Sequence, residues 1–330
     1  MKNLAWSTKL LRLAPPLLGL AAMAGLAHFV GADEVKDGVV RASAWLPLLL
    51  LIEGARIPLE ASATRNLLGK RSADVSLLTS LRAQLLFYSV STFAPGGRVL
   101  GEAAKAALLS PCVGVSTASA VATGSQAGSL IADALVALAG ALALYALFGW
   151  STFTALTLGF VLACVSLGAL LLLFQRHLRS LRWLGRFPRL ARAIGSFHEA
   201  LQKQRLFNAN VVATLVLARL GQALFFGVAL FALGGGFSLL RSLALLSLVM
   251  AGAVAGEAVP AQLGTADAVL VAAASAFSLA PAKMATLGVL FHITQLSLAG
   301  LSALAAAALH GDVPGSARGD RGAATVTDAG

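Results

Sequence analysis

The sequence predicts an all-α polytopic membrane protein with about six full transmembrane helices and two broken or re-entrant helical segments that form an internal repeat. Of its 330 residues, 58% are hydrophobic and 12% are charged, whereas about a quarter of the residues in a soluble domain are charged. The apolar runs are rich in Leu and Ala and lack the apolar–polar alternation of a transmembrane β-barrel. Two of the runs are interrupted by Pro- and Gly-containing motifs, and lipid cannot satisfy the backbone groups that such a break exposes.

The individual elements follow from the lengths of the apolar runs, because a helix needs roughly 20 apolar residues to cross a bilayer. Apolar runs that could supply these spans lie at about 13–30, 42–59, 127–148, 151–174, 208–233, 238–256 and 282–309. The segments 83–119 and 260–277 contain the interruptions and are the predicted broken segments. The sequence leaves open whether 260–277 re-enters or crosses, and with it the side on which the C-terminus lies.

The net charge of +11 is concentrated in a few short segments. Basic residues gather at the N-terminus, in the predicted loop 59–82 and in the segment 175–206, whereas the predicted loop 31–41 is mainly acidic. Because short loops rich in Lys and Arg stay in the cytoplasm, we expect a multi-pass protein of the bacterial cytoplasmic (inner) membrane with a cytoplasmic N-terminus. The segment 83–119 then begins and ends on the cytoplasmic side, which favours a re-entrant hairpin that enters from that side.

Residues 1–310 are predicted to form one integral membrane domain, and the tail 311–330 is predicted to be disordered because it has no hydrophobic pattern. Within the domain, the segment 175–206 has the pattern of a basic amphipathic stretch on a membrane surface. Pro188 should divide it into two short helices. Its charge either sets the topology alone or also attracts anionic lipid. The alternative of a cleaved signal peptide at the N-terminus is disfavoured by its long apolar run.

The two interrupting motifs contain the candidate site residues. In the first half these are Pro95, Gly96, Gly97, Arg98, Gly101, Glu102 and Lys105, and in the second half Glu257, Pro260, Gly264 and Asp267, with Arg219 on a neighbouring span. A broken helix presents free N–H groups and the positive end of its dipole, which attract anions. Glycines let the backbone approach a phosphate, and Arg98 and Lys105 add positive charge. Glu102 and Asp267 offer counter-ions or proton-binding groups, so the motifs predict a site for an anionic lipid head group.

The charged residues also have structural interpretations, which the sequence leaves open. Glu102 lies three residues from Lys105, so the two could form a local ion pair, as Glu102 could with Arg98. Asp133 lies inside a predicted span and needs a partner, which a Ser or Thr hydroxyl could also supply.

The second half offers a similar choice. Arg219 is expected to pair with Asp267 or Glu257, and Glu257 could instead cap a helix at the interface. His292 and Gln295 lie one helical turn apart in the last span. They either line a cavity or make contacts between helices.

In order and spacing, the motifs at 95–105 and 260–267 resemble those of the lysylphosphatidylglycerol synthase transmembrane-region family, whose members are described as flippase-like. The resemblance extends from about residue 13 to 309. Lys105 stands where Arg is commoner, Ala261 and Gln262 replace two glycines, and Asp267 replaces Glu. These departures suggest a divergent branch, and the resemblance implies an association with hopanoid or other isoprenoid lipid biosynthesis. The bifunctional members carry a soluble aminoacyl-transfer domain that has no counterpart in this sequence.

No metal-ligand cluster, phosphate loop or nucleophile motif is present in the sequence, so we expect no cofactor and no enzymatic activity. The basic residues flank membrane segments, which argues against nucleic-acid binding. We expect a transporter that moves an anionic or isoprenoid lipid between leaflets. The alternative is an accessory subunit or membrane enzyme of hopanoid or glycolipid biosynthesis. Membrane lipids, and possible lipid-biosynthesis enzymes, are the expected partners.

Overall fold

The computed structural model describes residues 21–94, 96–177, 188–203, 208–256 and 259–309, and these residues form helices without any β-strand. An apolar helix at Ala21–Val30 precedes the rest. The α-helices that follow are α2 (Ala32–Ala42), α3 (Leu46–Gly54), α4 (Arg56–Leu68), α5 (Leu77–Phe93), α6 (Gly97–Val113), α7 (Val115–Phe148), α8 (Thr152–His177), α9 (Pro188–Lys203), α10 (Ala209–Ala232), α11 (Leu239–Ala255), α12 (Thr265–Ala272) and α13 (Pro281–Ala308). The short 3₁₀ helices are η1 (Ser43–Trp45), η2 (Gly69–Asp74) and η5 (Pro260–Gln262).

Within the described residues, five helical stretches are long and apolar enough to cross a membrane, which confirms an all-α polytopic membrane protein. They are Ala32–Asp74, Val115–Phe148, Thr152–Leu171, Ala209–Ala232 and Pro281–Ala308. The spans predicted at 127–148, 151–174, 208–233 and 282–309 are thereby confirmed. Two shorter apolar helices, Ala21–Val30 and Leu239–Val254, accompany them.

The predictions for three segments are wrong. The predicted loop 31–41 forms helix α2, and the predicted loop 59–82 forms α4, η2 and the start of α5. The charged residues of these segments suggested loops, but some of them make hydrogen bonds within the protein. Arg65 Nη1, for example, donates to the carbonyl oxygen of Val75 at 2.6 Å. The full span predicted at 238–256 is instead the 17-residue helix α11, which reverses direction into α12.

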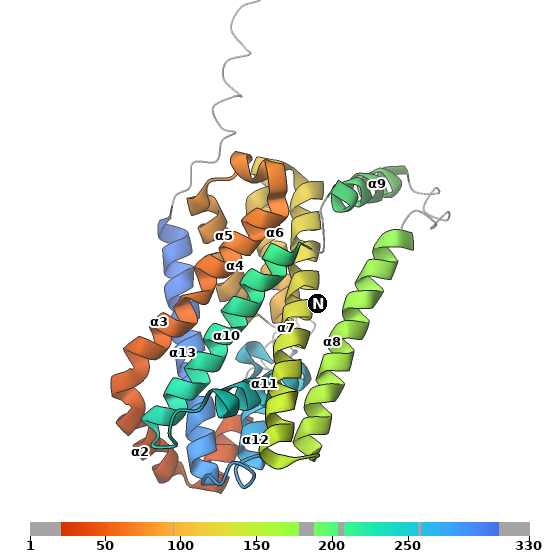
Figure 1. Ribbon diagram of the computed structural model, residues 1–330. Coiled ribbons are helices and arrows are strands. Elements are labelled where there is room, and N and C mark those ends of the chain that lie inside the picture. Colours follow the sequence, from red (N-terminus) through yellow and green to blue (C-terminus); the bar gives the residue numbers. More distant parts are fainter. Residues whose placement is uncertain (1–20, 95, 178–187, 204–207, 257–258, 310–330) are drawn as a thin grey trace, which may run out of the picture.

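The first broken segment is a helical hairpin made of α5 and α6. From the break, both arms extend to the end of the bundle at which α9 lies, here called the α9 end (Figure 1). Two contacts fix the hairpin there. Arg71 of η2 donates to the carbonyl oxygen of Val113 at 2.7 Å, and Arg82 of α5 donates to that of Ala306 at 2.9 Å. The chain therefore enters and leaves at one end, as a re-entrant hairpin does.

The second broken segment, α11 followed by η5 and α12, is a hairpin from the opposite end. This end, here called the α2 end, also holds the turn between α7 and α8 (Figure 1). The ring of Phe277, which follows α12, packs 4.9 Å from the ring of Phe148, which precedes that turn. Residues 260–277 thus return to the end from which α11 starts. Only α13 then crosses, so its last residue, Ala308, lies at the α9 end.

Glycines allow the arms of the first hairpin to approach each other. Gly96 caps α6 in the left-handed region with φ of 73°. A Cβ atom on Gly97 would lie 2.3 Å from the carbonyl oxygen of Ser91, and one on Gly101 would lie 2.9 Å from that of Phe87. Any larger side chain at either position would force α5 and α6 apart.

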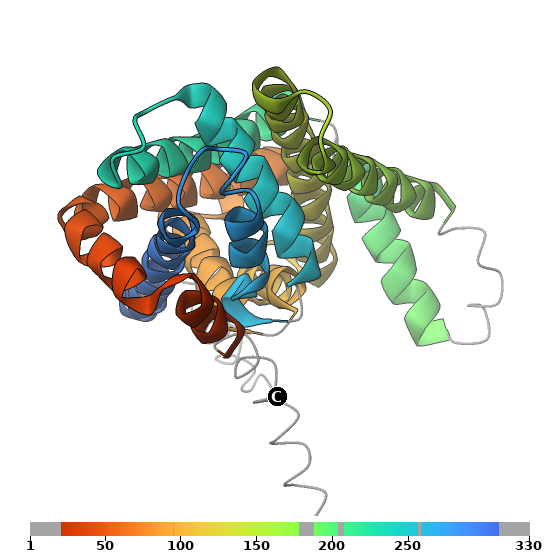
Figure 2. The ribbon, with the colours of Figure 1, turned by 90° about the horizontal axis from the view of Figure 1, so that it is seen from below.

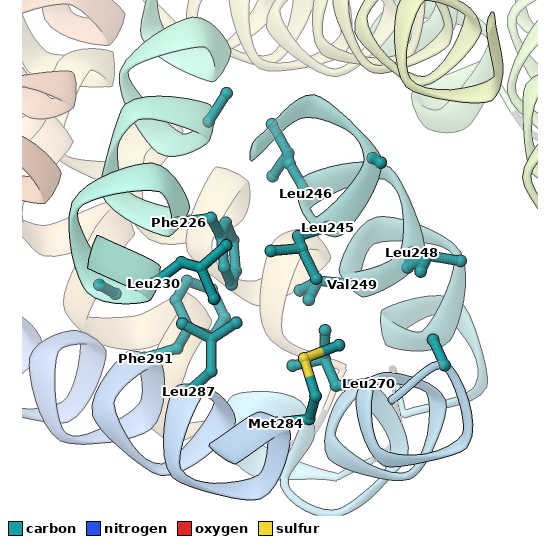
Figure 3. Packing of buried hydrophobic residues seen from close by; sticks show 14 of the residues in the cluster. Phe226, Leu230, Leu245, Leu246, Leu248, Val249, Leu270, Met284, Leu287 and Phe291 are labelled. Atoms are coloured by element: carbon teal, nitrogen blue, oxygen red, sulfur yellow. The ribbon is translucent and has the colours of Figure 1, made fainter. Parts of the chain in front are cut away.

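The main hydrophobic core lies at the α2 end, where α10, α11, α12 and α13 meet (Figure 3). Phe226 of α10, Leu245 of α11 and Leu287 of α13 are fully buried or nearly so. The second hairpin is therefore packed on several sides, which allows its broken backbone to persist at membrane depth.

Helices α8 and α9 lie at the periphery of the bundle in both views (Figures 1 and 2). Helix α9 begins at Pro188, the residue predicted to start a separate amphipathic helix. It rests on α7 through Phe197 and Leu201, and Ser196 hydrogen-bonds Ser116 at 2.8 Å. Residues 178–187 and 204–206 of the predicted basic segment, the predicted tail and the first 20 residues lie outside the described residues.

The two hairpins predict a labelling pattern that separates re-entry from crossing. In a background with Cys112→Ser and Cys164→Ser, thiols introduced by Phe237→Cys before α11 and Ser275→Cys after α12 should react with an impermeant maleimide from the same membrane face. Native Cys112, kept as the single cysteine, should react only from the opposite face. If Phe237→Cys and Ser275→Cys react from opposite faces, α11 and α12 together cross the membrane once and the hairpin assignment is wrong.

Candidate functional site

A cavity of about 450 Å³ lies where the two helix breaks meet. Ala94, Gly97 and Arg98 line it from the first break. Ala261 and Gln262 line it from the second. The two motifs, far apart in sequence, thus form one site at the tips of hairpins that enter from opposite ends.

The cavity wall carries an unusual number of charges for the interior of a helical membrane domain. Helices α4, α6, α7 and α10 supply four cations and three carboxylates: Arg56, Arg98, Lys105 and Arg219 with Glu60, Glu102 and Asp133. Each ionised group in a membrane segment costs at least about 2.5–3.5 kcal/mol. The cost is offset here because the charges form ion pairs, some between helices and some within one helix.

Asp133 of α7 is the centre of the larger charge cluster. Its Oδ1 accepts from Arg219 Nε of α10 at 2.6 Å, and its Oδ2 accepts from Arg98 Nη1 of α6 at 2.9 Å. Arg219 Nη1 also lies 3.8 Å from Glu60 Oε1. The predicted pairing of Arg219 with Asp267 is therefore wrong, and Asp133 has cationic partners. The sequence did not predict this pairing, because Asp133 and Arg219 are 86 residues apart.

Glu102 and Lys105 form the local ion pair that their spacing suggested. Lys105 Nζ donates to Glu102 Oε1 at 2.9 Å and to Ser125 Oγ at 3.0 Å, and it lies 4.8 Å from the centre of the Phe87 ring. The Lys105 residue is only 2% exposed. Glu102 Oε2 is buried and has no hydrogen-bond partner among the described residues, so it keeps acceptor capacity at the cavity.

A second cluster was not identified from the sequence. Arg56 of α4 pairs with Glu53 and with Glu60, whose Oε1 is 3.1 Å from Arg56 Nη2. Gln84 of α5 donates to Glu60 Oε2 at 2.6 Å, and Tyr88 donates to Glu53 Oε1 at 3.4 Å. The sequence did indicate this cluster, because the spacing of positions 53, 56 and 60 places all three on one face of a helix.

The second break has a strained backbone. Ala261 has φ of 54° and Gln262 has φ of 57°, both in the left-handed region that favours glycine. Each such residue costs on the order of 1–3 kcal/mol, and strain of this kind clusters at functional sites. The two positions are those at which the resembling family has glycines, so the chain keeps the glycine-like conformation without the glycines.

Asp267 lies behind the cavity wall and fixes the second break. Its Oδ2 accepts from the backbone N–H of Gly264 at 2.9 Å and lies 2.8 Å from His292 Nε2. Gly288 of α13 makes room for it, because a Cβ atom there would lie 1.9 Å from Asp267 Oδ1. Asp267 is 2% exposed and thus anchors the N-terminus of α12 to α13. Gln295, one turn beyond His292, does line the cavity.

The cavity brings together only part of the predicted site. Gly97, Arg98, Glu102, Lys105 and Arg219 line it. The others are placed elsewhere: Gly96 and Gly101 shape the first hairpin, Gly264 and Asp267 hold the second, Pro260 begins η5, and Pro95 and Glu257 lie outside the described residues.

The fold and site define a class: a polytopic helical membrane protein in which two inverted, broken hairpins enclose a charged cavity. The family model described as lysylphosphatidylglycerol synthase TM region matches residues 15–303, and the chain belongs to this family. It is a family of membrane domains linked to lipid synthesis and flipping. Searches of curated proteins and of solved structures found no match.

The shared carboxylate of Asp133 predicts a large effect on stability. Asp133→Asn should lower the free energy of unfolding by about 3–5 kcal/mol, because Arg219 and Arg98 lose their buried counter-ion. Denaturation in detergent micelles, followed by circular dichroism, measures this change.

A double-mutant cycle provides the control for this prediction. In the Arg219→Gln background, Asp133→Asn should lower the free energy of unfolding by clearly less than in the wild type, because one of the cations paired with Asp133 is already absent. Costs that add within about 0.3–0.5 kcal/mol would show that the two side chains do not interact.

Proposed function

We propose that the protein moves an anionic lipid between the leaflets of the membrane and that the charged cavity holds the lipid head group during the passage. The observation that carries the proposal is the position of the cavity at the meeting point of two broken hairpins, in an otherwise apolar bundle. Transporters bind substrates at such paired helix breaks near the middle of the membrane.

The charges favour a phosphate-bearing head group. Four cations and three carboxylates line the cavity, and a fourth carboxylate, that of Glu53, pairs with Arg56 behind the wall, so the cluster as a whole is balanced in charge. Arg98, whose side chain is 29% exposed, is the most accessible cation of the ion pairs at the wall. Helix α6 begins at Gly97 beside it, which adds the positive end of a helix dipole. An Arg guanidinium and a helix N-terminus both match a phosphate.

Translocation by this route involves no change in covalent bonds. For a proton-coupled cycle, the candidate titrating groups are Glu102, which lines the cavity, and Asp267, which holds the second break. Loss of the Asp267 charge would weaken the contacts to Gly264 and His292, so the second hairpin could shift relative to α13.

We further propose that the α9 end faces the cytoplasm of a bacterial inner membrane. This end carries Arg71, Arg82 and the basic residues of α9, whereas the α2 end carries the acidic residues of α2. Positive residues mark the cytoplasmic side, and the N-terminus is proposed to lie there too. Labelling of Cys112 only in inverted vesicles supports this orientation, and labelling only in right-side-out vesicles contradicts it.

The function is tested by fluorescent-lipid redistribution in proteoliposomes, with an anionic phospholipid, a neutral phospholipid and a polyprenyl phosphate as separate substrates. Glu102→Gln should slow transport by about tenfold or more, because a charged hydrogen bond contributes about 1.5–3 kcal/mol. Asp267→Asn should slow it as well, through the second break. Glu34→Gln is the matched control, since it removes an exposed carboxylate at the α2 end.

Each outcome of this assay has a clear meaning, provided that the variants melt near the wild-type temperature. Faster transport of the polyprenyl phosphate than of the phospholipid would assign the isoprenoid substrate and favour lipid-biosynthesis enzymes as partners. No redistribution of any of the three lipids by the wild type would contradict the proposal. A chemically altered lipid recovered from the vesicles would instead support a membrane enzyme.

A further inference from the structure

A second hollow lies between α7 and α8, and it is apolar. This groove has a volume of about 310 Å³, and every residue that lines it is aliphatic, glycine or cysteine. Leu138 of α7 and Val165 of α8 are 41% and 56% exposed, so the groove opens away from the bundle. In a membrane-spanning segment, the surroundings of such a face are the hydrocarbon chains of the bilayer.

The groove adjoins the charged cavity. Cys164 of α8 lines both, and on α7 the cavity residues Leu130 and Asp133 are next to the groove residue Ala134. Leu130, Ala134 and Cys164 pack together in the contact between the two helices, here called the α7–α8 seam. Two of these three side chains are small, so only a thin layer separates the cavity from the groove.

Among the described helices, α8 contacts mainly α7 and, to a smaller extent, α11. It lies at the outside of the bundle in both views, joined to α7 by the turn at the α2 end (Figures 1 and 2). Outward displacement of α8 would therefore disturb a small part of the core. No helix in the part of the chain that the structure describes covers the lining residues Leu135, Leu138 and Val165, which are exposed.

We propose that the groove holds a hydrocarbon chain of the same lipid whose head group lies in the cavity, and that the lipid enters sideways through the α7–α8 seam. The inference rests on the proposed function and adds a route and a second binding element to it. The head group needs the charged side of the seam and the chain needs the apolar side. One molecule that straddles Cys164 satisfies both.

Two glycines of α8 provide a matched test. A Cβ atom on either Gly168 or Gly159 would meet nothing within 4 Å, so a side chain can begin at either position without a clash at Cβ. Gly168 lines the groove, whereas Gly159 lines neither the groove nor the cavity. Gly168→Trp fills the groove and Gly159→Trp adds the same bulk to the same helix outside it.

The measurement is the redistribution of long-chain phosphatidylglycerol in proteoliposomes. Gly168→Trp should slow it by about tenfold or more relative to Gly159→Trp, because the indole and the lipid chain would compete for the same space and a tenfold change needs only about 1.4 kcal/mol on the barrier. The difference should shrink for a short-chain phosphatidylglycerol, which leaves the groove partly empty. Gly168→Leu, with a smaller side chain, replaces Gly168→Trp if the latter does not fold.

The results separate this inference from the proposed function. If the wild type transports lipid and Gly168→Trp is as fast as Gly159→Trp, the groove does not bind the chain, whereas the proposed transport function is retained. Equal slowing by both tryptophans also overturns it, because the effect then comes from bulk on α8. A wild type that moves no lipid overturns the proposed function and the groove together.

Discussion

The pairing of Asp133 with Arg219 and Arg98 is the constraint on which the rest of the structure depends. A charge inside a membrane domain persists only with a partner, and these three residues come from α7, α10 and α6. Their contact ties the first hairpin to two of the long helices. Arg219 extends the network to Glu60 of α4, and Glu60 binds Gln84 of α5. The charges therefore position both arms of the first hairpin and form the cavity wall at the same time.

The second hairpin is held differently. Its cap, Asp267, binds Gly264 and His292, while apolar side chains of α10 and α13 pack against it. Ala261 and Gln262 keep a strained backbone at the cavity. One wall of the site is thus fixed by ion pairs and the other by packing and a single carboxylate.

Much of the fold could be predicted from the sequence, because run length and broken motifs report directly on membrane helices. The hairpin of α7 and α8, the break before Gly97 and the helix starting at Pro188 all follow local patterns. The site could be predicted only in part. Glu102 and Lys105 pair within one helix, but Asp133 and Arg219 meet through tertiary packing, which spacing does not reveal. The cluster of Arg56 with Glu53 and Glu60 was missed because the three positions were not considered as one helix face.

The most direct test of the account is a cryo-electron microscopy map of the protein in nanodiscs of anionic phospholipid. The central claim is that a lipid head group occupies the charged cavity. The account predicts phosphate-sized density within hydrogen-bonding distance of Arg98, with chain density that continues past Cys164 between α7 and α8. Ordered lipid found only around the outer surface, with the cavity holding water alone, would contradict it.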